Sequence, residues 1–218
     1  MGLDNVRILK IEKKINAKNN EIADNIRRLR KKLGIPMVDI MGSVGSGKTS
    51  ILEYYAKKYH GKKKLLVING DLATDIDAQR IAKYGGTCLQ INTGRGCHLK
   101  AFQVEEALKQ VNLKDYDFIF VENVGNIICP SSNDVGADFK IVVTSVTEGP
   151  YVFEKHPISF KMSKIAVINK TDLANAMEIN IEELIKKANS LYPGMPIVPT
   201  STKTGEGMDK LAELIGLK

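Results

Sequence analysis

Gly42-Ser43-Val44-Gly45-Ser46-Gly47-Lys48-Thr49 matches the pattern G-x-x-x-x-G-K-[ST] at every position and decides the fold of this chain. Its three glycines let the backbone wrap closely around a polyphosphate, so that N–H groups can donate to the phosphate oxygens. Lys48 would reach the β- and γ-phosphates, and the Thr49 hydroxyl would bind Mg²⁺. The motif follows the apolar residues 37–41 and opens a helical pattern, whose N-terminus favours anions. Together with Ser50, these residues predict a binding site for a nucleoside triphosphate.

Outward from this motif, short apolar runs alternate with helical patterns. The predicted strands lie near 37–41, 64–69, 87–91, 117–122, 139–145, 164–169 and 196–200. The helical stretches lie near 48–60, 76–84, 98–111, 178–191 and 206–216. Several strands are continuous apolar runs, as expected when both faces of a parallel sheet are covered. The pattern predicts an α/β fold, a three-layer P-loop NTPase domain with a mainly parallel sheet, over residues 35–218.

Residues 1–34 form a separate segment with a helical pattern. Its aliphatic stripe predicts an N-terminal amphipathic helix that ends at Gly34 and packs on the main domain or on a second copy. The segment holds ten basic and four acidic residues and so supplies most of the formal net charge of +7. We interpret these charges as a solvated helix face and rank nucleic-acid binding below it, because no nucleic-acid motif is present. The stripe consists of Ile8, Ile11, Ile15, Ile22, Ile26, Leu29 and Leu33.

The composition excludes several classes of protein. The chain is 43% hydrophobic and 26% charged, which is ordinary for a globular protein and argues against disorder. The longest clean apolar runs have four residues, so we expect neither a membrane span nor a secretory signal. Three cysteines cannot make a disulfide framework, and we therefore expect a cytoplasmic protein whose cysteines serve packing, metal or redox chemistry.

A second motif, Asn169-Lys170-Thr171-Asp172, directly follows a predicted strand and matches N-K-x-D. A carboxylate at Asp172 can accept two hydrogen bonds from N1 and N2 of guanine, a pair of donors that adenine does not offer. Asn169 would support the loop, and Lys170 would cover the base. Ser201-Thr202-Lys203 follows the next strand and resembles the loop that completes a guanine pocket. With the upstream P-loop, these residues predict a protein that binds GTP.

Acidic residues follow two further predicted strands. Glu122 ends one strand, three residues before Gly125. This is the place for a second carboxylate on the Mg²⁺ side, usually Asp, and for a glycine that senses the γ-phosphate. Asp71 ends another strand and is a second candidate near Mg²⁺. Asp77 could orient the attacking water or a Mg²⁺ ligand, within a segment that could order when GTP binds, or it could simply cap a helix. The predicted catalytic residues are Lys48, Thr49, Asp77 and Glu122.

Two cysteines and one histidine form a further candidate site, because their side chains are soft metal ligands. Cys97 and His98 follow the predicted strand that ends at Ile91, and Cys129 lies seven residues after Glu122. Loops that leave parallel strands at their carboxyl ends share one edge of the sheet with the P-loop, so the three side chains could meet near the nucleotide. Thiolate and imidazole suit Zn²⁺ or Ni²⁺, and a second chain or water would complete the site. The alternative is two small buried residues and a surface histidine.

Six dispersed segments together resemble the hydrogenase nickel-incorporation GTPase family, HypB, of the SIMIBI class of P-loop GTPases. In chain order they are GSVGSGKT, GDLATDIDAQR, NTGRGCHL, FVENVGNIICP, TEGPYVFEKHP and INKTDL. The resemblance implies a metal-regulated GTPase that forms a homodimer and loads nickel into the [NiFe]-hydrogenase large-subunit precursor. It also implies a nickel-donor metallochaperone as partner, GTP hydrolysis coupled to metal release, and Ni²⁺ or Zn²⁺ at Cys97, His98 and Cys129 in the dimer interface.

The chain departs from parts of this family. It has neither the N-terminal cysteine cluster nor the histidine-rich run of some members, so we expect no high-affinity nickel store. Phe102 and Glu106 occupy the stretch where some relatives have further histidines, which leaves the fourth ligand open. The urease nickel-loading GTPases are an alternative, but they typically have Cys-Pro-His where this chain has Cys97-His98. A non-catalytic metal-binding dimer, in which nucleotide only holds the fold together, is the alternative of a different class.

Overall fold

The computed structural model describes residues 3–71, 76–94 and 96–218, with the side chains of the first helix described from Ala17 onward. Within these residues, seven parallel strands form one sheet in the order β3-β2-β4-β1-β5-β6-β7. The predicted strands are therefore confirmed, and the mainly parallel sheet is parallel at every pairing of named strands. The strands are β1 Met37–Gly42, β2 Leu65–Asp71, β3 Thr87–Asn92, β4 Phe118–Glu122, β5 Phe139–Ser145, β6 Ile165–Asn169 and β7 Ile197–Pro199.

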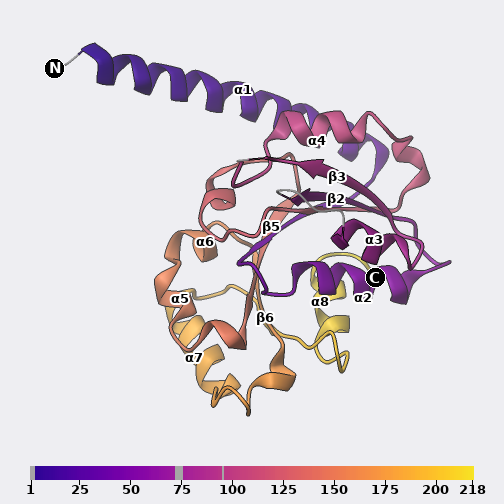
Figure 1. Cartoon of the computed structure of the whole chain (residues 1–218), viewed down its shortest axis with the longest axis vertical. Helices are drawn as coiled ribbons and strands as arrows, with labels where there is room; N and C mark the ends of the chain where they lie inside the picture. Colours follow the sequence, from indigo (N-terminus) through magenta and orange to yellow (C-terminus); the bar gives the residue numbers. More distant parts are fainter. Residues whose placement is uncertain (1–2, 72–75, 95) are drawn as a thin grey trace.

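Helices cover both faces of this sheet and make the predicted three layers (Figure 1). One face packs against α2 Lys48–Tyr59, α3 Ile76–Ala82 and α8 Met208–Leu214. On the other face, α1 Leu3–Leu33 and α4 Ala101–Leu108 lie over the half that contains β2 and β4. Three further helices cover β5 and β6 on that face: α5 Val152–Lys155, α6 Pro157–Lys161 and α7 Ile181–Leu191. None of the described helices is both long and apolar enough to span a bilayer.

The alternation of side chains along each strand creates a core on each face. In β4, Phe118 and Phe120 point to the side of α2, whereas Ile119 and Val121 point to the side of α1 and α4. Tyr55 of α2 stacks on Phe120 with ring centroids 6.2 Å apart, and its hydroxyl donates to the Met208 carbonyl oxygen at 2.9 Å. The apolar strands and their covering helices thus hold the carboxyl edge of the sheet, where the predicted site residues lie.

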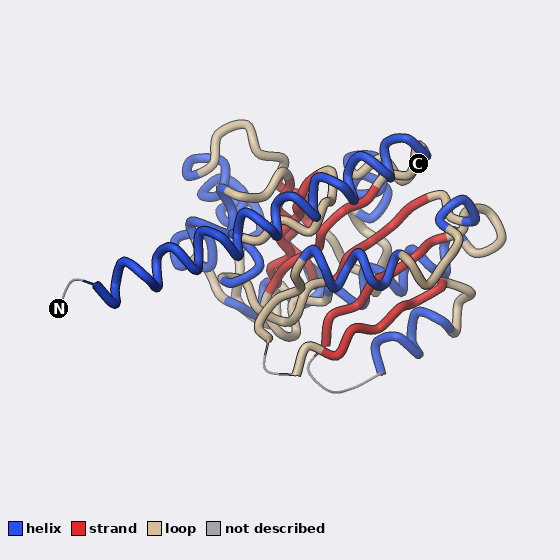
Figure 2. Tube along the Cα trace, turned by 90° about the horizontal axis from the view of Figure 1, so that it is seen from above, coloured by secondary structure: helices blue, strands red, loops and turns tan. Residues whose placement is uncertain are grey.

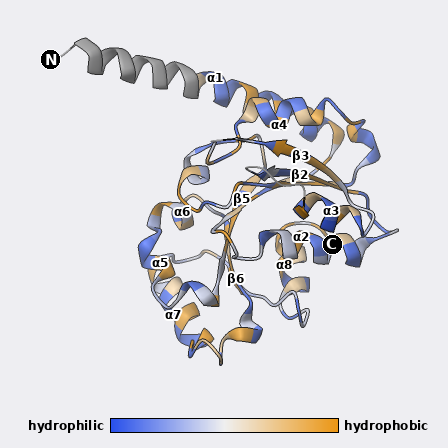
Figure 3. Ribbon diagram, in the orientation of Figure 1, coloured by the Kyte–Doolittle hydropathy of each residue, from blue (hydrophilic) through white to orange (hydrophobic). Residues whose placement is uncertain are grey.

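The helix α1 extends well beyond the sheet at its N-terminal end (Figure 2). Its described part mixes hydrophobic and hydrophilic residues (Figure 3), and the helix ends at Leu33, just before Gly34, as predicted. Ile26 is buried against the domain, but Leu29 of the same predicted stripe is 47% exposed. The stripe therefore packs on the main domain only in part, and Ile8, Ile11 and Ile15 lie outside the described side chains.

One basic residue of α1 corrects the prediction of a wholly solvated charged face. Arg30 is fully buried, and its guanidinium donates to Asp138 Oδ2 at 3.0 Å and to the Gly136 carbonyl oxygen at 2.6 Å. These contacts join α1 to the segment that leads into β5. Partial burial acts to raise the pKa of Asp138, but the hydrogen bonds from Arg30 and the Met37 N–H, together with the nearby positive charges, lower it overall. Sequence periodicity does not reveal such an arginine, since Asp138 and Gly136 lie more than a hundred residues away.

Candidate nucleotide and metal sites

The P-loop spans the end of β1 and the start of α2. Gly47 has φ +96°, and a Cβ at this position would come within 2.2 Å of the Asn169 side-chain nitrogen. Only glycine fits this conformation and this approach. The same Asn169 nitrogen donates to the Ser46 carbonyl oxygen at 3.0 Å, and its oxygen accepts from Thr200 Oγ1 at 3.1 Å. The first residue of the N-K-x-D motif therefore supports the P-loop directly.

Lys48 folds back over its own loop. Its Nζ donates to the carbonyl oxygens of Gly42 and Ser43 at 3.1 and 3.0 Å. Burial lowers the pKa of Lys48, while the charges of Glu122, Asp77 and Glu148 oppose that shift. The Ser43 hydroxyl in turn donates to Glu148 Oε2 at 2.8 Å. The ammonium group is thus held beside the concave side of the loop, surrounded by carbonyl oxygens and carboxylates.

Thr49 and Glu122 form a buried pair of oxygen groups. The Thr49 hydroxyl donates to Glu122 Oε1 at 2.6 Å, and Asn69 Nδ2 donates to Oε2 at 2.9 Å. Burial raises the pKa of the Glu122 carboxyl to about 7, while the hydrogen bond from Thr49 and the charge of Lys48 act in the opposite direction. The two predicted residues on the Mg²⁺ side therefore touch, although they are far apart in the sequence.

The other predicted acidic residues lie around this pair. Asp71 is the last residue of β2, and the register of β2 with β4 places Asn69 opposite Glu122, so Asp71 follows toward the carboxyl edge. Asp77 lies in the first turn of α3, and its charge acts on both Lys48 and Glu122. The segment predicted to order with GTP, 71–80, is described apart from residues 72–75.

An arginine that the motifs did not indicate connects α2 with α3. Arg80 Nη1 donates to Asp77 Oδ1 at 3.1 Å, and Nη2 contacts Glu53 Oε2 at 2.5 Å and Ser50 Oγ at 3.3 Å. The predicted nucleotide residue Ser50 thus faces the side of α2 that meets α3. The guanidinium also pairs with the Asp77 carboxylate. This contact fits a structural role for Asp77 as well as its predicted catalytic role.

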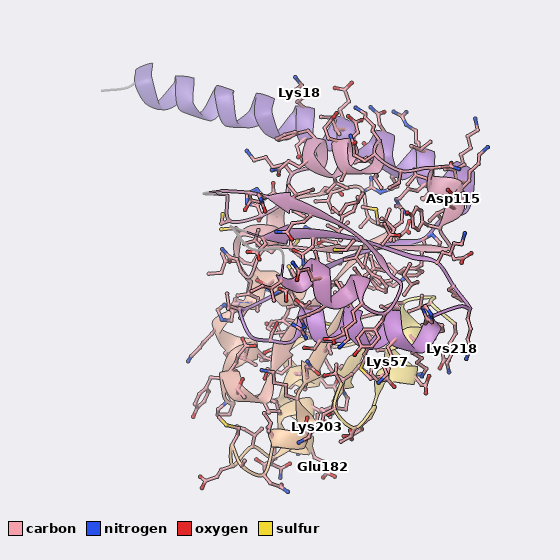
Figure 4. The ribbon with its side chains drawn as sticks, turned by 45° about the vertical axis from the view of Figure 1, so that its right-hand side comes forward. Lys18, Lys57, Asp115, Glu182, Lys203 and Lys218 are labelled. Atoms are coloured by element: carbon pink, nitrogen blue, oxygen red, sulfur yellow. The ribbon has the colours of Figure 1, made fainter. Side chains whose placement is uncertain are left out.

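The predicted guanine-reading residues gather at the ends of β6 and β7. Asp172 is exposed, and its Oδ1 accepts from the Ser201 hydroxyl at 2.6 Å. Lys170 adopts a left-handed conformation with φ 62°, and its Cε lies 3.9 Å from where a Cβ of Gly47 would be. Thr202 and Lys203 border a hollow of about 610 Å³ next to α2, with Lys57 on its opposite side (Figure 4). The N-K-x-D loop therefore contacts both the loop of Ser201–Lys203 and the P-loop.

The loop after β4 is attached to the P-loop. Asn126 forms an isolated antiparallel bridge with Gly42, and a Cβ on Gly125 would lie 2.6 Å from Val44 Cγ2. The Asn126 side-chain oxygen accepts from the backbone N–H groups of Ile128 and Cys129, at 2.8 and 3.3 Å. One asparagine thus joins the P-loop backbone to the turn that carries a predicted metal ligand.

Cys97, His98 and Cys129 converge. Their candidate ligand atoms all lie within 4.8 Å of one another, and Cys97 Sγ is 3.4 Å from His98 Nδ1. The hydrogen bond with Cys129 and then burial raise the pKa of the Cys97 thiol, whereas burial lowers the pKa of His98. The loops that follow β3 and β4 thus bring two sulfurs and one neutral imidazole together, a donor set that suits Ni²⁺ or Zn²⁺. Cys88, by contrast, packs against the core below α2.

Comparison with known proteins identifies the family. Residues 36–199 match the family model "CobW/HypB/UreG, nucleotide-binding domain". The chain belongs to this family. The probable hydrogenase maturation factor HypB of Methanocaldococcus jannaschii is 42% identical, over 96% of this chain and 95% of that protein. The predicted resemblance to HypB is therefore confirmed.

Solved HypB structures support the same assignment. HypB from Archaeoglobus fulgidus superimposes with a TM-score of 0.84 at 34% identity, covering 92% of this chain and 98% of that one. HypB from Helicobacter pylori, solved in complex with nickel, has a TM-score of 0.85 at 34% identity, covering 92% of this chain and 94% of that one. The fold of this HypB-family chain is thus that of a P-loop GTPase.

Several residues that shape the sites of this HypB-family chain were missed by the sequence reasoning. Glu148 accepts from the Ser43 hydroxyl and, through Oε1, from the Ser145 backbone N–H at 2.9 Å. Asn126 and Arg80 likewise connect predicted residues without belonging to a nucleotide motif. Glu148, Asn126 and Arg80 lie inside three of the segments that carry the HypB resemblance, so position within a motif was the available signal.

Proposed function

We propose that this HypB-family protein is a GTPase that carries nickel as its cargo and acts in the maturation of [NiFe]-hydrogenase. The observation that carries this proposal is the loop from Glu122 to Cys129. It begins at the carboxylate that contacts Thr49, pairs with the P-loop through Asn126, and ends at a ligand of the cysteine–histidine cluster. A nucleotide bound at one end of this loop would affect the position of the metal ligand at the other end. A bound metal would in turn affect the position of the nucleotide contacts.

In this proposal the N-K-x-D and P-loop residues bind GTP. Asp172 would read guanine N1 and N2, with Ser201 holding its carboxylate in place. Asn169 supports the P-loop, and Lys170 lies close enough to Gly47 to cover a base. The domain would be 35–218, with the helix of 1–34 attached to it. The proposed nucleotide contacts are Gly42, Ser43, Val44, Gly45, Ser46, Gly47, Lys48, Thr49, Ser50, Gly125, Asn169, Lys170, Asp172, Ser201, Thr202 and Lys203.

The residues around Thr49 fit Mg²⁺. Thr49 and Glu122 offer a hydroxyl and a buried carboxylate, which are hard oxygen ligands, and Asp71 lies at the neighbouring strand end. When bound, Mg²⁺ would neutralise charge on the phosphates. The chain's own contribution is to hold these oxygens in place: Asn69 donates to the second oxygen of Glu122 and so orients the carboxylate.

Hydrolysis would depend on charge stabilisation by the P-loop. Lys48 would leave the Gly42 and Ser43 carbonyls that it contacts and turn to the β- and γ-phosphates, together with the P-loop N–H groups. Asp77 would orient the attacking water, and its charge already acts on Lys48. A lysine held by weak backbone acceptors is ready to move to a stronger anion when one arrives.

Nickel would bind to Cys97, His98 and Cys129, with Zn²⁺ as the competing occupant. Both thiols must lose their protons on binding, so the affinity is expected to fall at low pH. One chain supplies three ligand atoms, and a second copy at a dimer interface would complete the coordination. The relatives named as hydrogenase maturation factors and the nickel complex of the Helicobacter pylori protein support this assignment. A nickel-donor metallochaperone would supply the ion, and the hydrogenase large-subunit precursor would receive it.

The proposal is tested by titrating Ni²⁺ into the nucleotide-free, GDP-bound and GTP-analogue-bound protein while the oligomer mass is recorded. We expect a different Ni²⁺ affinity in the GTP-analogue form, and by linkage Ni²⁺ should change the nucleotide affinity by the same factor. Cys97→Ala and Cys129→Ala should lose stoichiometric metal but keep GTP binding. Equal Ni²⁺ affinity in all three states would contradict the coupling, and absent GTP turnover in the wild type would favour the non-catalytic alternative.

A further inference from the structure

Asp39 is a fully buried acid in the centre of β1, whose other residues are apolar or glycine. In the register of the sheet it lies between Val121 of β4 and Lys140 of β5. Its neighbours two residues away, Met37 and Met41, belong to the cores on the side of α1, α4 and α5–α7, so Asp39 faces that side. A carboxylate buried in this way is costly unless it is paired. Its partners therefore indicate its role.

The first partner leads to the loop of Cys97 and His98. Asn123 is buried, and its Nδ2 donates to Asp39 Oδ1 at 2.9 Å. The other end of the amide, Oδ1, accepts from the Leu99 backbone N–H at 2.9 Å. An ionised Asp39 carboxylate only accepts, so it determines which end of the amide points to Leu99. Leu99 directly follows the two ligands, so this contact anchors their loop to the sheet.

The second partner leads to the turn of Cys129. Lys140 Nζ lies 3.9 Å from Asp39 Oδ2. The ammonium donates to the carbonyl oxygens of Pro130 and Ser131 at 2.6 and 3.1 Å, and also to that of Asn133. The first two carbonyls belong to the 3-10 turn Cys129–Ser132. Lys140 thus holds this turn, while Asp39 supplies the nearest buried opposite charge.

We propose that Asp39 is a positioning residue for the metal cluster and holds the two ligand-carrying loops in place through Asn123 and Lys140. The proposal rests on the metal site proposed above and deepens it. One arm originates at Asn123, directly after β4, and the other at Lys140 on β5. These strands lie on either side of β1, and the arms meet at one carboxylate. Removing the charge therefore disturbs both loops at once. Groups that orient metal ligands typically change metal affinity by about 10–100-fold when they are replaced.

The test compares Asp39→Asn with the matched control Thr144→Val. Thr144 is also fully buried in a central strand, and its hydroxyl has no hydrogen-bond partner among the described residues. Ni²⁺ affinity is measured by competition with a chromophoric chelator, and the thiolate-to-metal absorption of the Co²⁺-loaded protein reports ligand geometry. We expect Asp39→Asn to weaken Ni²⁺ binding about tenfold and to alter the absorption. Thr144→Val should change neither, and GDP affinity should stay within about twofold in both variants.

A double-mutant cycle with Lys140→Met separates positioning from general loosening. If Asp39 acts on the Cys129 turn through Lys140, the double variant should lose less Ni²⁺ affinity than the product of the two single losses. A loss of Ni²⁺ affinity in the double variant equal to the product of the two single losses would overturn the proposed action of Asp39 through Lys140. Wild-type Ni²⁺ affinity and absorption in Asp39→Asn would overturn the positioning role while leaving the metal site in place. Wild-type protein that binds no stoichiometric metal would overturn both the metal site and the role of Asp39.

Discussion

The P-loop and the cluster of Cys97, His98 and Cys129 lie at the same edge of the sheet, but different contacts hold them. The P-loop is one continuous segment between a strand and a helix, and its conformation depends on glycines, on backbone contacts and on the Asn169 amide of the nucleotide site itself. The cluster joins two loops that side chains hold: the buried Asn123 accepts from Leu99 of one loop, and the half-buried Asn126 accepts from Cys129 of the other. The nucleotide site should therefore lose function when its own residues change, whereas the metal site should also respond to residues that never touch metal.

The largest effect is expected at the nucleotide side, from Lys48→Ala. The variant removes the ammonium that now contacts the Gly42 and Ser43 carbonyls and would stabilise the transferred phosphoryl group. Loss of one such charge-stabilising group typically lowers kcat by about 10²–10³-fold. Phosphate release under saturating GTP measures this effect. Ni²⁺ binding without nucleotide serves as the control and should be unchanged, and a parallel loss of metal would contradict the separation of the two sites.

The next largest effect is expected on the pH dependence of stability, from the buried carboxylate of Glu122. Burial raises its pKa from 4.5 to about 7, with Asp77 acting in the same direction and Thr49, Lys48 and Arg80 in the other. The folded protein thus binds this proton more tightly than the unfolded chain does. The resulting stabilisation is complete below pH 4.5 and is lost as the pH rises through 7, by at most about 3 kcal/mol.

Glu122→Gln removes this titration, because an amide stays neutral. Without nucleotide and with a chelator present, the free energy of unfolding of the wild type should fall relative to that of the variant between pH 5 and pH 8. Denaturant unfolding at a series of pH values measures the difference. A difference that does not vary with pH would show that Glu122 is not the group that titrates.

Asp172→Asn should change the base that the protein selects. The amide no longer accepts from both N1 and N2 of guanine, so GTP affinity should fall by about 10–100-fold, as expected for hydrogen bonds to a charged group. Xanthosine triphosphate, whose base offers an oxygen where guanine has its amino group, should gain affinity. Competition binding with the two nucleotides measures the switch. An unchanged preference for GTP would assign the recognition of the base to other residues.

Motifs with local geometry were predictable from the sequence, and long-range polar contacts were not. The seven strands appear as apolar runs, and Gly42–Thr49 forms its loop from its own residues. The short helices α5 and α6 were not predicted, since four or five residues show little periodicity. Arg30, whose charge suggested a solvated face, is buried because Asp138 and two carbonyl oxygens, of Ile35 and Gly136, accept from it.

The metal site likewise combines a feature that the sequence could predict with one that it could not. The convergence of Cys97, His98 and Cys129 could be expected from topology, because the loops after β3 and β4 leave the same edge. The contacts that hold these loops could not be expected, because Asp39 interrupts an apolar strand and its partners lie just after β4 and on β5. A single sequence gives no measure of which buried polar groups face each other across a sheet.

Asn126→Ala should give the smallest effect. It also gives the sharpest comparison of the nucleotide and metal sites, because this residue belongs to both. Its backbone pairs with Gly42, and this bridge survives the substitution, whereas its side-chain oxygen, which accepts from the N–H groups of Ile128 and Cys129, is lost. We therefore expect GTP affinity to stay near that of the wild type and Ni²⁺ affinity to fall about tenfold. The ratio of Ni²⁺ affinities with and without a GTP analogue should also move toward one, because the turn of Cys129 then follows the P-loop less closely. Calorimetric titrations of nucleotide, and of Ni²⁺ with and without the GTP analogue, measure these affinities in the wild type and in Asn126→Ala. A wild-type ratio in Asn126→Ala would show that coupling runs through another part of the loop.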